Sequence, residues 1–498
     1  MRGAAIVIAA LSLAAAPALA QSAAPRTTHD ARDLPTKRLG PADFQKLARQ
    51  AAAAYASGEY DAAERALREQ LAAQPDNTSV RYNLALCLGA AGKDADAAAT
   101  LLEVIDGGFS NLARIEREPA LRGAREDDRI AALRGDWPAV LNRQRDNVLA
   151  LAREDFPGCK REVIDDDLRI VILSSHSAQA VERTRRDLAR VASWASWLSA
   201  GGKADVPDPW VVVVLPPKPE FRAWAARSFG ALARGSFSQV GGSYDNARKR
   251  LVALDAGPTL RHEFVHILQF RAGERLGQEY PIWILEGIAS LAEDMDPARD
   301  GLSPAPSWRT NIARRSLKSG VLAGFADLAA MNQTQFQQPR PLVNYAAARA
   351  FFLFLNSEGR LPAFWKDYAS GGHEEDRTGV TSIERVLEMN ARDAQTRFET
   401  WLRLLPDVNE EVPSGGASLG ADVEAREGEG VVVSAVVGNK PNGLRRRDVI
   451  QEIDGRPIRD IGELIRVLGS YHPGARVPVI VERGGAEVEI ELELRAAR

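Results

Sequence analysis

Residues 259–270 read TLRHEFVHILQF and contain two histidines and a glutamate at a spacing that can do chemistry. A helix turns about 100° per residue, so His262 and His266 lie on one face and can aim both imidazoles at one point. That geometry suits a zinc ion. Glu263 stands one step around the helix, where it can reach a metal-bound water without being a ligand. A helix that carries these residues by chance is the alternative, because unrelated helices also show the pattern.

The motif requires a further donor downstream, because zinc in hydrolases usually takes three protein ligands and leaves the fourth position to water. The run PIWILEGIASLAED, residues 281–294, predicts an apolar helix that is interrupted by Glu286. Nineteen residues separate His266 from Glu286, which is enough for the chain to turn back between two helices. We therefore expect His262, His266 and Glu286 to bind one zinc ion per chain.

The segments around the motif predict an α+β domain. LRIVIL (168–173) and WVVVVL (210–215) are typical of buried strands, and the sequence between them has the apolar spacing of a helix. GGSYDNARKRLVALD (241–255) predicts a turn followed by a strand, and we expect the RLVALD part to pair with extended substrate. The pattern is mainly helical after Pro258, which favours the N-terminus of the histidine helix.

The phrases HEFVH (262–266) and WILEG (283–287) resemble the gluzincin metallopeptidases, the thermolysin-like class of zincin-like peptidases. They resemble in particular the peptidase MA-like domains of exported bacterial proteins. The resemblance covers residues 165–406. It implies His262, His266 and Glu286 as the zinc ligands and Glu263 as the general base.

The same resemblance implies a donor for the oxyanion, because the family often has a tyrosine at the start of a helix such as NYAAARAFFLFL (344–355). Tyr345 occupies that place. The alternative is a tyrosine that packs against an aromatic core formed by Phe351, Phe352 and Phe354.

Two features depart from the family. Thermolysin-like enzymes have an aspartate four residues after the ligand glutamate to orient a histidine, whereas this chain has Ser290. We expect Asp294 or a backbone carbonyl to orient the histidine instead. The GxMEN-type sequence that holds a free substrate amine in one aminopeptidase branch is also absent, which weakens an exopeptidase assignment.

The N-terminal residues MRGAAIVIAALSLAAAPALA predict a cleaved secretory signal peptide over residues 1–20, followed by a linker over residues 21–39. We therefore expect a periplasmic or secreted protein with no integral membrane segment after cleavage. Cys87 and Cys159 are the only cysteines, so no disulfide framework is indicated and both are expected to be buried.

Residues 40–151 resemble tetratricopeptide repeats. Gly58 aligns with Gly92 and Ala63 with Ala97, each pair 34 residues apart, which is the length of that repeat and puts small residues where paired helices approach closely. A plain helical hairpin is the alternative. We expect an all-α region here.

Residues 413–498 resemble a bacterial PDZ domain, through SLGADV, DVIQEIDG and PGARVPVIVERGG. In that family a leucine-glycine loop, here Leu419 and Gly420, offers backbone N–H groups to the carboxylate of a peptide C-terminus beside a strand edge. Arg447 stands where the family usually has glycine, which indicates a changed turn. A small β-rich domain of another kind is the alternative.

The predicted protein is thus multidomain, with tetratricopeptide-like helices, an α+β zincin-like peptidase domain and a β-rich PDZ domain. With 64 Lys and Arg against 67 Asp and Glu, no overall charge favours nucleic acid as a partner. We expect an exported zinc peptidase, with an endopeptidase favoured, that acts on protein or peptide substrates recruited or gated by the flanking domains. A catalytically inactive envelope adaptor and an aminopeptidase are the alternatives.

Overall fold

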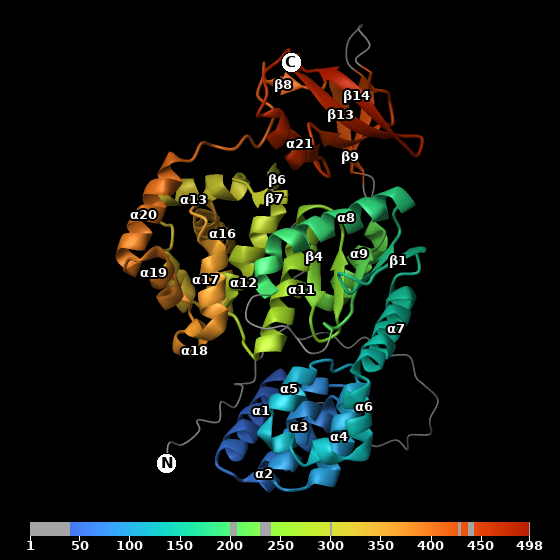
Figure 1. The fold of residues 1–498 in the computed structure, drawn as a ribbon, viewed down its shortest axis with the longest axis vertical. Coiled ribbons are helices and arrows are strands. Elements are labelled where there is room, and N and C mark those ends of the chain that lie inside the picture. Colours follow the sequence, from blue (N-terminus) through green and yellow to red (C-terminus); the bar gives the residue numbers. More distant parts are fainter. Residues whose placement is uncertain are drawn as a thin grey trace. The chain divides into compact units, whose positions relative to one another are not determined.

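The computed structural model describes residues 40–199, 207–229, 241–298, 301–426, 430–436 and 443–497. The chain divides into two compact units: the first contains the N-terminal helices up to Leu151, and the second contains most of the remaining chain (Figure 1). The expected signal peptide and linker, residues 1–39, lie outside the described residues. Among the described residues, no helix combines the length and the apolar character needed to span a membrane.

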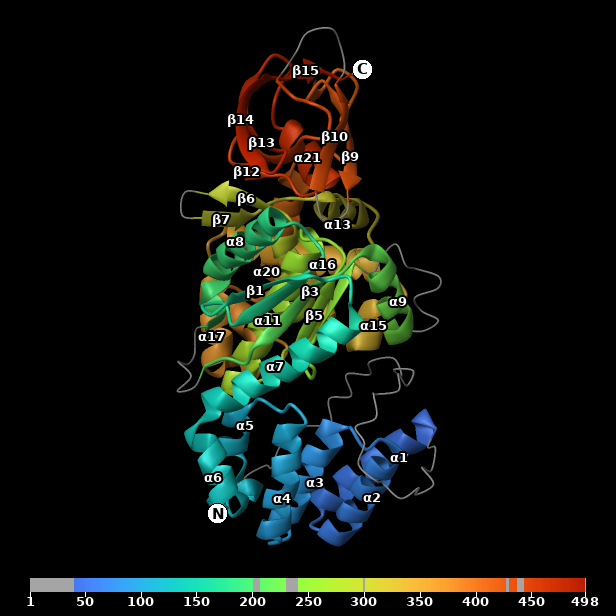
Figure 2. The same ribbon diagram turned by 90° about the vertical axis from the view of Figure 1, so that its right-hand side faces the viewer.

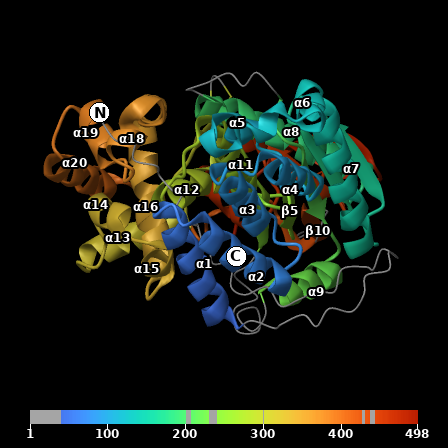
Figure 3. The ribbon, with the colours of Figure 1, turned by 90° about the horizontal axis from the view of Figure 1, so that it is seen from below.

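The first unit begins with two helical hairpins, which Figure 3 shows as neighbouring helices. Gly58 and Gly92 end the first helix of each hairpin in the same left-handed conformation, with φ of 78° and 73°, which glycine adopts without strain. Ala63 and Ala97 are fully buried where the helices pack. The predicted 34-residue repeat is therefore confirmed. The helices are α1 (Pro41–Ala56), α2 (Tyr60–Ala73), α3 (Thr78–Ala90) and α4 (Asp94–Asp106), followed by α5 (Leu112–Arg117), α6 (Asp128–Gly135) and α7 (Trp137–Asp155).

The second unit contains a five-stranded sheet with the strand order β1-β2-β3-β5-β4, part of which is visible in Figure 2. The three central strands are parallel, and the two outer strands are antiparallel to their neighbours. Every residue of β2 and β3 is buried, as their continuous apolar sequences predict for parallel strands. The strands are β1 (Arg161–Asp165), β2 (Ile170–Ser174), β3 (Val211–Leu215), β4 (Gly242–Asp245) and β5 (Arg250–Ala253).

The hairpin formed by β4 and β5 corrects one expectation. The RLVA segment forms β5, which lies between β3 and β4 and has strand partners on both sides. It therefore has no edge at which a substrate can pair. The preceding GSYD segment, which was predicted to be a turn, forms β4 at the end of the sheet.

Helices complete the mixed α/β part of the second unit. Trp283 of α12 (Ile282–Ala289) packs against Phe351 and Phe352 of α16 (Pro341–Ser357), with ring centroids 6.1 and 5.0 Å apart. All three rings are fully buried in one continuous core. The helices of this part also include α8 (Ala178–Trp194), α11 (Pro258–Leu276), η4 (Ser290–Glu293), α13 (Trp308–Lys318) and α15 (Gln333–Gln337). This core fixes the positions of α11 and α12, which carry the predicted metal ligands.

The C-terminal residues form a β-rich region with its own apolar core. Its sheet has the path β14-β13-β11-β10-β9, so β9 is an end strand. One helix, α21 (Ile461–Leu468), buries Leu464, Val467 and Leu468 in the same core as the strands of the sheet. The strands of the path are β9 (Ala421–Arg426), β10 (Gly430–Val436), β11 (Val449–Ile453), β13 (Arg476–Arg483) and β14 (Ala486–Glu493).

Arg447 occupies the position in this β-rich region where the resemblance to PDZ domains implies a glycine. Its φ is 73°, a left-handed conformation that favours glycine. The turn is held by its contacts: the N–H of Arg447 donates to the carbonyl of Val433, and Arg483 donates two hydrogen bonds to Asp448 at 2.8 and 2.7 Å. Arg447 thus adopts a left-handed conformation at the position where the resemblance implies a glycine.

Gly287 sets how closely α12 approaches α16. A Cβ added there would lie 2.4 Å from the Phe352 ring and 3.2 Å from the backbone of Ala348. Gly287→Ala is therefore expected to reduce the free energy of unfolding by about 1–3 kcal/mol through overpacking. Urea unfolding followed by tryptophan fluorescence measures this change. Gly135→Ala is the control, because a Cβ there meets no atom within 4 Å; equal stabilities of the two variants would contradict the close packing.

Candidate metal centre

The histidine helix α11 begins and ends where its sequence predicts. Pro258 occupies its first turn, and Gly277 ends it in a left-handed conformation with φ of 71°, which is typical of a helix C-terminus. Leu260, Phe264 and Ile267 are fully buried. His262 and His266 project from another side of the helix, with their ring centroids 4.8 Å apart.

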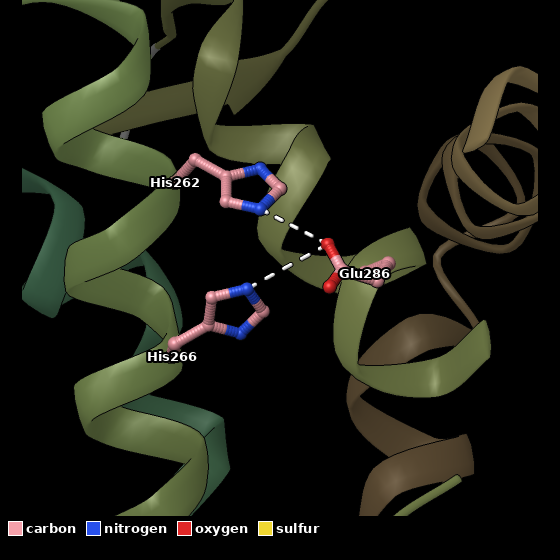
Figure 4. Close-up of side chains that lie close together, drawn as sticks. All are labelled: His262, His266 and Glu286. Carbon is pink, nitrogen blue, oxygen red and sulfur yellow. Dashed lines mark hydrogen bonds and ion pairs between the residues drawn. The ribbon is translucent and has the colours of Figure 1, made fainter. Parts of the chain in front are cut away.

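His262, His266 and Glu286 converge on one point, with Glu286 reaching across from α12 (Figure 4). The Oε2 atom of Glu286 lies 3.1 Å from Nε2 of His262 and 3.7 Å from Nε2 of His266. One donor atom from each residue lies within 4.8 Å of the others. The structure therefore brings together the three side chains that the sequence predicted as ligands.

The other ring nitrogen of His262 faces Glu293, at 3.0 Å from its Oε1 atom. Arg309 of α13 holds the same carboxylate through two hydrogen bonds of 2.6 and 3.0 Å. A carboxylate accepts hydrogen bonds, so Nδ1 of His262 carries the proton and Nε2 is left to bind a metal. Carboxylates in this position commonly orient a metal-bound histidine.

The expectation that Asp294 or a backbone carbonyl orients the histidine was wrong. Asp294 instead faces Arg349 and Arg466, at 3.7 and 3.8 Å. The chain tightens from α-helix into the 3₁₀ turn η4 after α12, so positions counted along an α-helix no longer predict the direction of these side chains. Ser290 is fully buried, and its hydroxyl donates to the carbonyl of Gly287.

His266 is oriented by Gln269, one helical turn further along α11. Nδ1 of His266 lies 2.8 Å from the Oε1 atom of Gln269, and the amide nitrogen of Gln269 donates to the carbonyl of Leu285. Because the amide nitrogen has this acceptor, its oxygen is directed to the imidazole. Gln269 thus joins α11 to the residue that precedes Glu286.

Glu263 is positioned by the end strand of the sheet. Its Oε2 atom accepts a 2.8 Å hydrogen bond from the backbone N–H of Tyr244 in β4. Glu263 does not belong to the group of donor atoms formed by His262, His266 and Glu286. This position is consistent with the predicted base and not with a ligand.

Tyr345 lies in the first turns of α16, as the resemblance implied. Burial raises its pKa, and the charges of Glu286 and Glu263 raise it further. The hydroxyl is therefore in electrostatic reach of both carboxylates and stays protonated at neutral pH. The ring also packs against Phe336, with a centroid distance of 5.1 Å, so the structure accommodates both the catalytic and the packing interpretation.

The charges of the cluster are strongly coupled. Burial lowers the pKa of His262, but hydrogen bonds to Glu286 and Glu293 outweigh burial and raise it to about 10. Burial raises the pKa of Glu286, but the two imidazoles hold it well below its usual value. The pKa of Glu293 is held at about 2 because Arg309 and His262 outweigh burial. Without a metal, the two ionised carboxylates therefore keep His262 protonated, and a metal ion bound here would take the place of the Nε2 proton.

The donor set fits a zinc ion. Zinc bonds of 2.0–2.1 Å in a tetrahedral site place two ligand atoms about 3.3 Å apart. The observed separations from Glu286, 3.1 and 3.7 Å, lie on either side of that value. Two imidazoles and one carboxylate are also the ligand types of catalytic zinc sites that leave a fourth position open.

Sequence reasoning missed Glu293, Arg309 and Gln269. Gln269 follows His266 by three residues, and this helical spacing is the signal that could have found it. No spacing rule points to Glu293 or Arg309, because one follows a change of helix type and the other comes from a different helix.

The predicted peptide-binding loop of the C-terminal region lies just before β9. Leu419 is buried, and Gly420 has φ of 65°. The guanidinium of Arg495 lies beside this loop: a Cβ added to Gly420 would be 3.3 Å from its Nη1 atom. A positive group next to backbone N–H groups suits a carboxylate.

Comparisons with known proteins agree with the two flanking regions. Residues 417–494 match the family model described as a PDZ domain, and residues 54–111 match the one described as a tetratricopeptide repeat. The chain is similar to a solved aminopeptidase N family protein from Idiomarina loihiensis, at 14% identity and a TM-score of 0.26, over 68% of this chain and 67% of that chain. A search of curated proteins finds no match. The protein thus has helical repeats at one end, a mixed α/β middle and a PDZ domain at the other end.

Glu293→Gln is expected to weaken the binding of a divalent metal, probed with zinc, by about 10- to 100-fold, because the amide orients and polarises His262 less well than the carboxylate. Competition with a chromophoric chelator measures the dissociation constant. Ser290→Ala is the matched control, because the Ser290 hydroxyl donates to the carbonyl of Gly287 and not to a histidine. Equal affinities of the two variants would show that Glu293 does not support the site.

Proposed function

We propose that this chain is an exported zinc peptidase that hydrolyses peptide bonds of protein or peptide substrates. The observation that carries the proposal is the convergence of His262, His266 and Glu286, with Glu263 held beside them. Zinc bound there would polarise the substrate carbonyl and supply a water nucleophile of lowered pKa. The alternative of an inactive adaptor is disfavoured because the ligands, the base and their orienting partners are all present.

The chain's own residues divide the work. Glu293 and Gln269 hold the two imidazoles through Nδ1, so that both Nε2 atoms face Glu286. Glu263 takes a proton from the attacking water and passes it to the leaving amine. The N–H of Tyr244 keeps the Glu263 carboxylate in place. Tyr345, protonated at neutral pH, donates to the oxyanion that forms on the substrate.

The position of β4 favours an endopeptidase. Of the two end strands of the sheet, β4 is the one whose backbone contacts Glu263. An extended peptide that pairs with the outer edge of β4 passes the base in mid-chain, and strand pairing does not require a terminus. Aminopeptidase activity is the alternative, and the termini of the products distinguish the two.

His262→Ala is expected to lose zinc, whereas Glu263→Gln is expected to keep zinc and its fold while losing several orders of magnitude in activity, because Glu263 acts as the base and not as a ligand. Purified protein is assayed for zinc content and for cleavage of an unstructured protein, with and without chelator. Stoichiometric zinc in His262→Ala would contradict the proposed metal site. Near-normal cleavage by Glu263→Gln would assign the proton transfer to another residue. A wild-type protein that binds zinc but cleaves nothing would support the adaptor.

The PDZ domain is proposed to select substrates or partners by their C-termini. β9 is the end strand of its sheet, and the loop that precedes β9 contains Gly420 beside Arg495. A peptide that adds to β9 would bring its terminal carboxylate to this loop. The periplasmic or secreted location stays a prediction from the N-terminal sequence.

A peptide with a free apolar C-terminus is expected to bind the full chain about 10- to 100-fold more tightly than its amidated form, because a charge-assisted hydrogen bond is worth roughly 1.5–3 kcal/mol. Fluorescence titration of the Glu263→Gln protein with the two matched peptides measures this without cleavage. Equal affinities would rule out carboxylate capture and leave strand addition without a terminus.

A further inference from the structure

Arg261, the residue before the first metal-ligand histidine, is a buried arginine that the proposed reaction does not use. Its side chain is 2% exposed. Nε donates to the carbonyl of Ala292 at 2.8 Å, and Nη2 donates to the carbonyl of Glu293 at 2.5 Å. Arg261 therefore holds the backbone of the residue whose carboxylate orients His262.

The partner of Arg261 comes from the PDZ domain. Nη2 of Arg261 also donates to Oε1 of Glu463 in α21, at 2.6 Å, and the Glu463 side chain is likewise 2% exposed. The second oxygen of Glu463 accepts from the backbone N–H of Arg459 at 2.8 Å. Burial raises the pKa of Glu463, but Arg261 and Arg459 outweigh it and hold the pKa at about 2. Glu463 is thus a buried anion at neutral pH.

The helix that carries Glu463 also contacts the far end of the same segment. Arg466, one turn along α21, lies 3.8 Å from Asp294 and also pairs with Asp296. Residues 292–296 are therefore contacted by α21 at one end through Arg261 and at the other end directly. A buried ion pair of this kind contributes little net stability but fixes a geometry when its hydrogen bonds are satisfied.

We infer that Glu463 of the PDZ domain is a positioning residue of the metal centre: it holds Arg261, which holds the backbone that aims Glu293 at His262. The inference rests on the proposed function, and it makes the PDZ domain part of the catalytic unit. Asp187, 3.6 Å from Arg261, is a second carboxylate that pairs with this arginine.

Glu463→Gln tests this relay in the full chain, because it keeps the shape of the side chain and removes its charge. The expected result is a zinc dissociation constant raised about 10-fold, at the lower end of the range for groups that orient metal ligands, with a lower kcat at saturating zinc and an unchanged KM. Glu482→Gln is the matched control: Glu482 of β13 pairs with Arg183 of α8 at 2.6 Å, between the same two parts of the chain, without contacting Arg261. Its zinc affinity should equal that of the wild type.

Arg261→Lys provides a second variant, because lysine keeps the charge but lacks the fork that reaches both carbonyls. It should weaken zinc binding as Glu463→Gln does, and the double variant should be no weaker than either single one, since both interrupt one relay. Wild-type zinc affinity in both single variants, or fully additive losses in the double variant, would overturn the relay. A wild-type protein that binds no zinc would instead refute the proposed function.

Discussion

Partial burial of the Glu286 carboxylate, whose side chain is 16% exposed, is the constraint on which the rest of this site depends. A carboxylate removed from water is costly unless cations or hydrogen-bond donors surround it. Two imidazoles provide that environment here, at 3.1 and 3.7 Å. The orientation of the two imidazoles is in turn fixed through their Nδ1 atoms, by Glu293 and Gln269. Each of these polar groups requires a further partner. Arg309 holds Glu293, a backbone carbonyl accepts from Gln269, and Glu463 pairs with the arginine that holds the backbone of Glu293.

The sequence was sufficient to predict the parts of the site that depend on local periodicity. His262 and His266 meet because an α-helix brings every fourth residue to one side, and α11 is an uninterrupted helix. Glu286 was predicted by chemical need, since a catalytic zinc takes a third ligand. The repeat of Gly58 and Gly92 was equally readable, because both occupy the same left-handed turn. These inferences require no knowledge of distant contacts.

The remaining features depend on contacts between distant residues. β4 was missed because GSYD lacks the β-branched residues that indicate a strand; pairing with β5 stabilises it. Glu293, and not the expected Asp294, orients His262 because the chain changes from an α-helix to a 3₁₀ turn after Ala289. The burial of Arg261 could not be predicted at all, since its partner Glu463 lies 202 residues further along the chain. Charged residues are normally exposed, so only the assembled structure reveals such a pair.

In the proposed metal centre, the arrangement of charges also distinguishes the metal ligand Glu286 from Glu293, which orients His262. Glu293 and Glu286 are both carboxylates beside His262, yet Arg309 holds both oxygens of Glu293. A carboxylate engaged in this way is a poor competitor for a metal, whereas the Glu286 carboxylate faces the Nε2 atoms of both imidazoles. In the proposed metal centre, Arg309 therefore leaves Glu286 as the ligand and keeps Glu293 as the residue that orients His262. The HExxH motif indicates the two histidines and the base, whereas the role of each neighbouring carboxylate depends on this arginine.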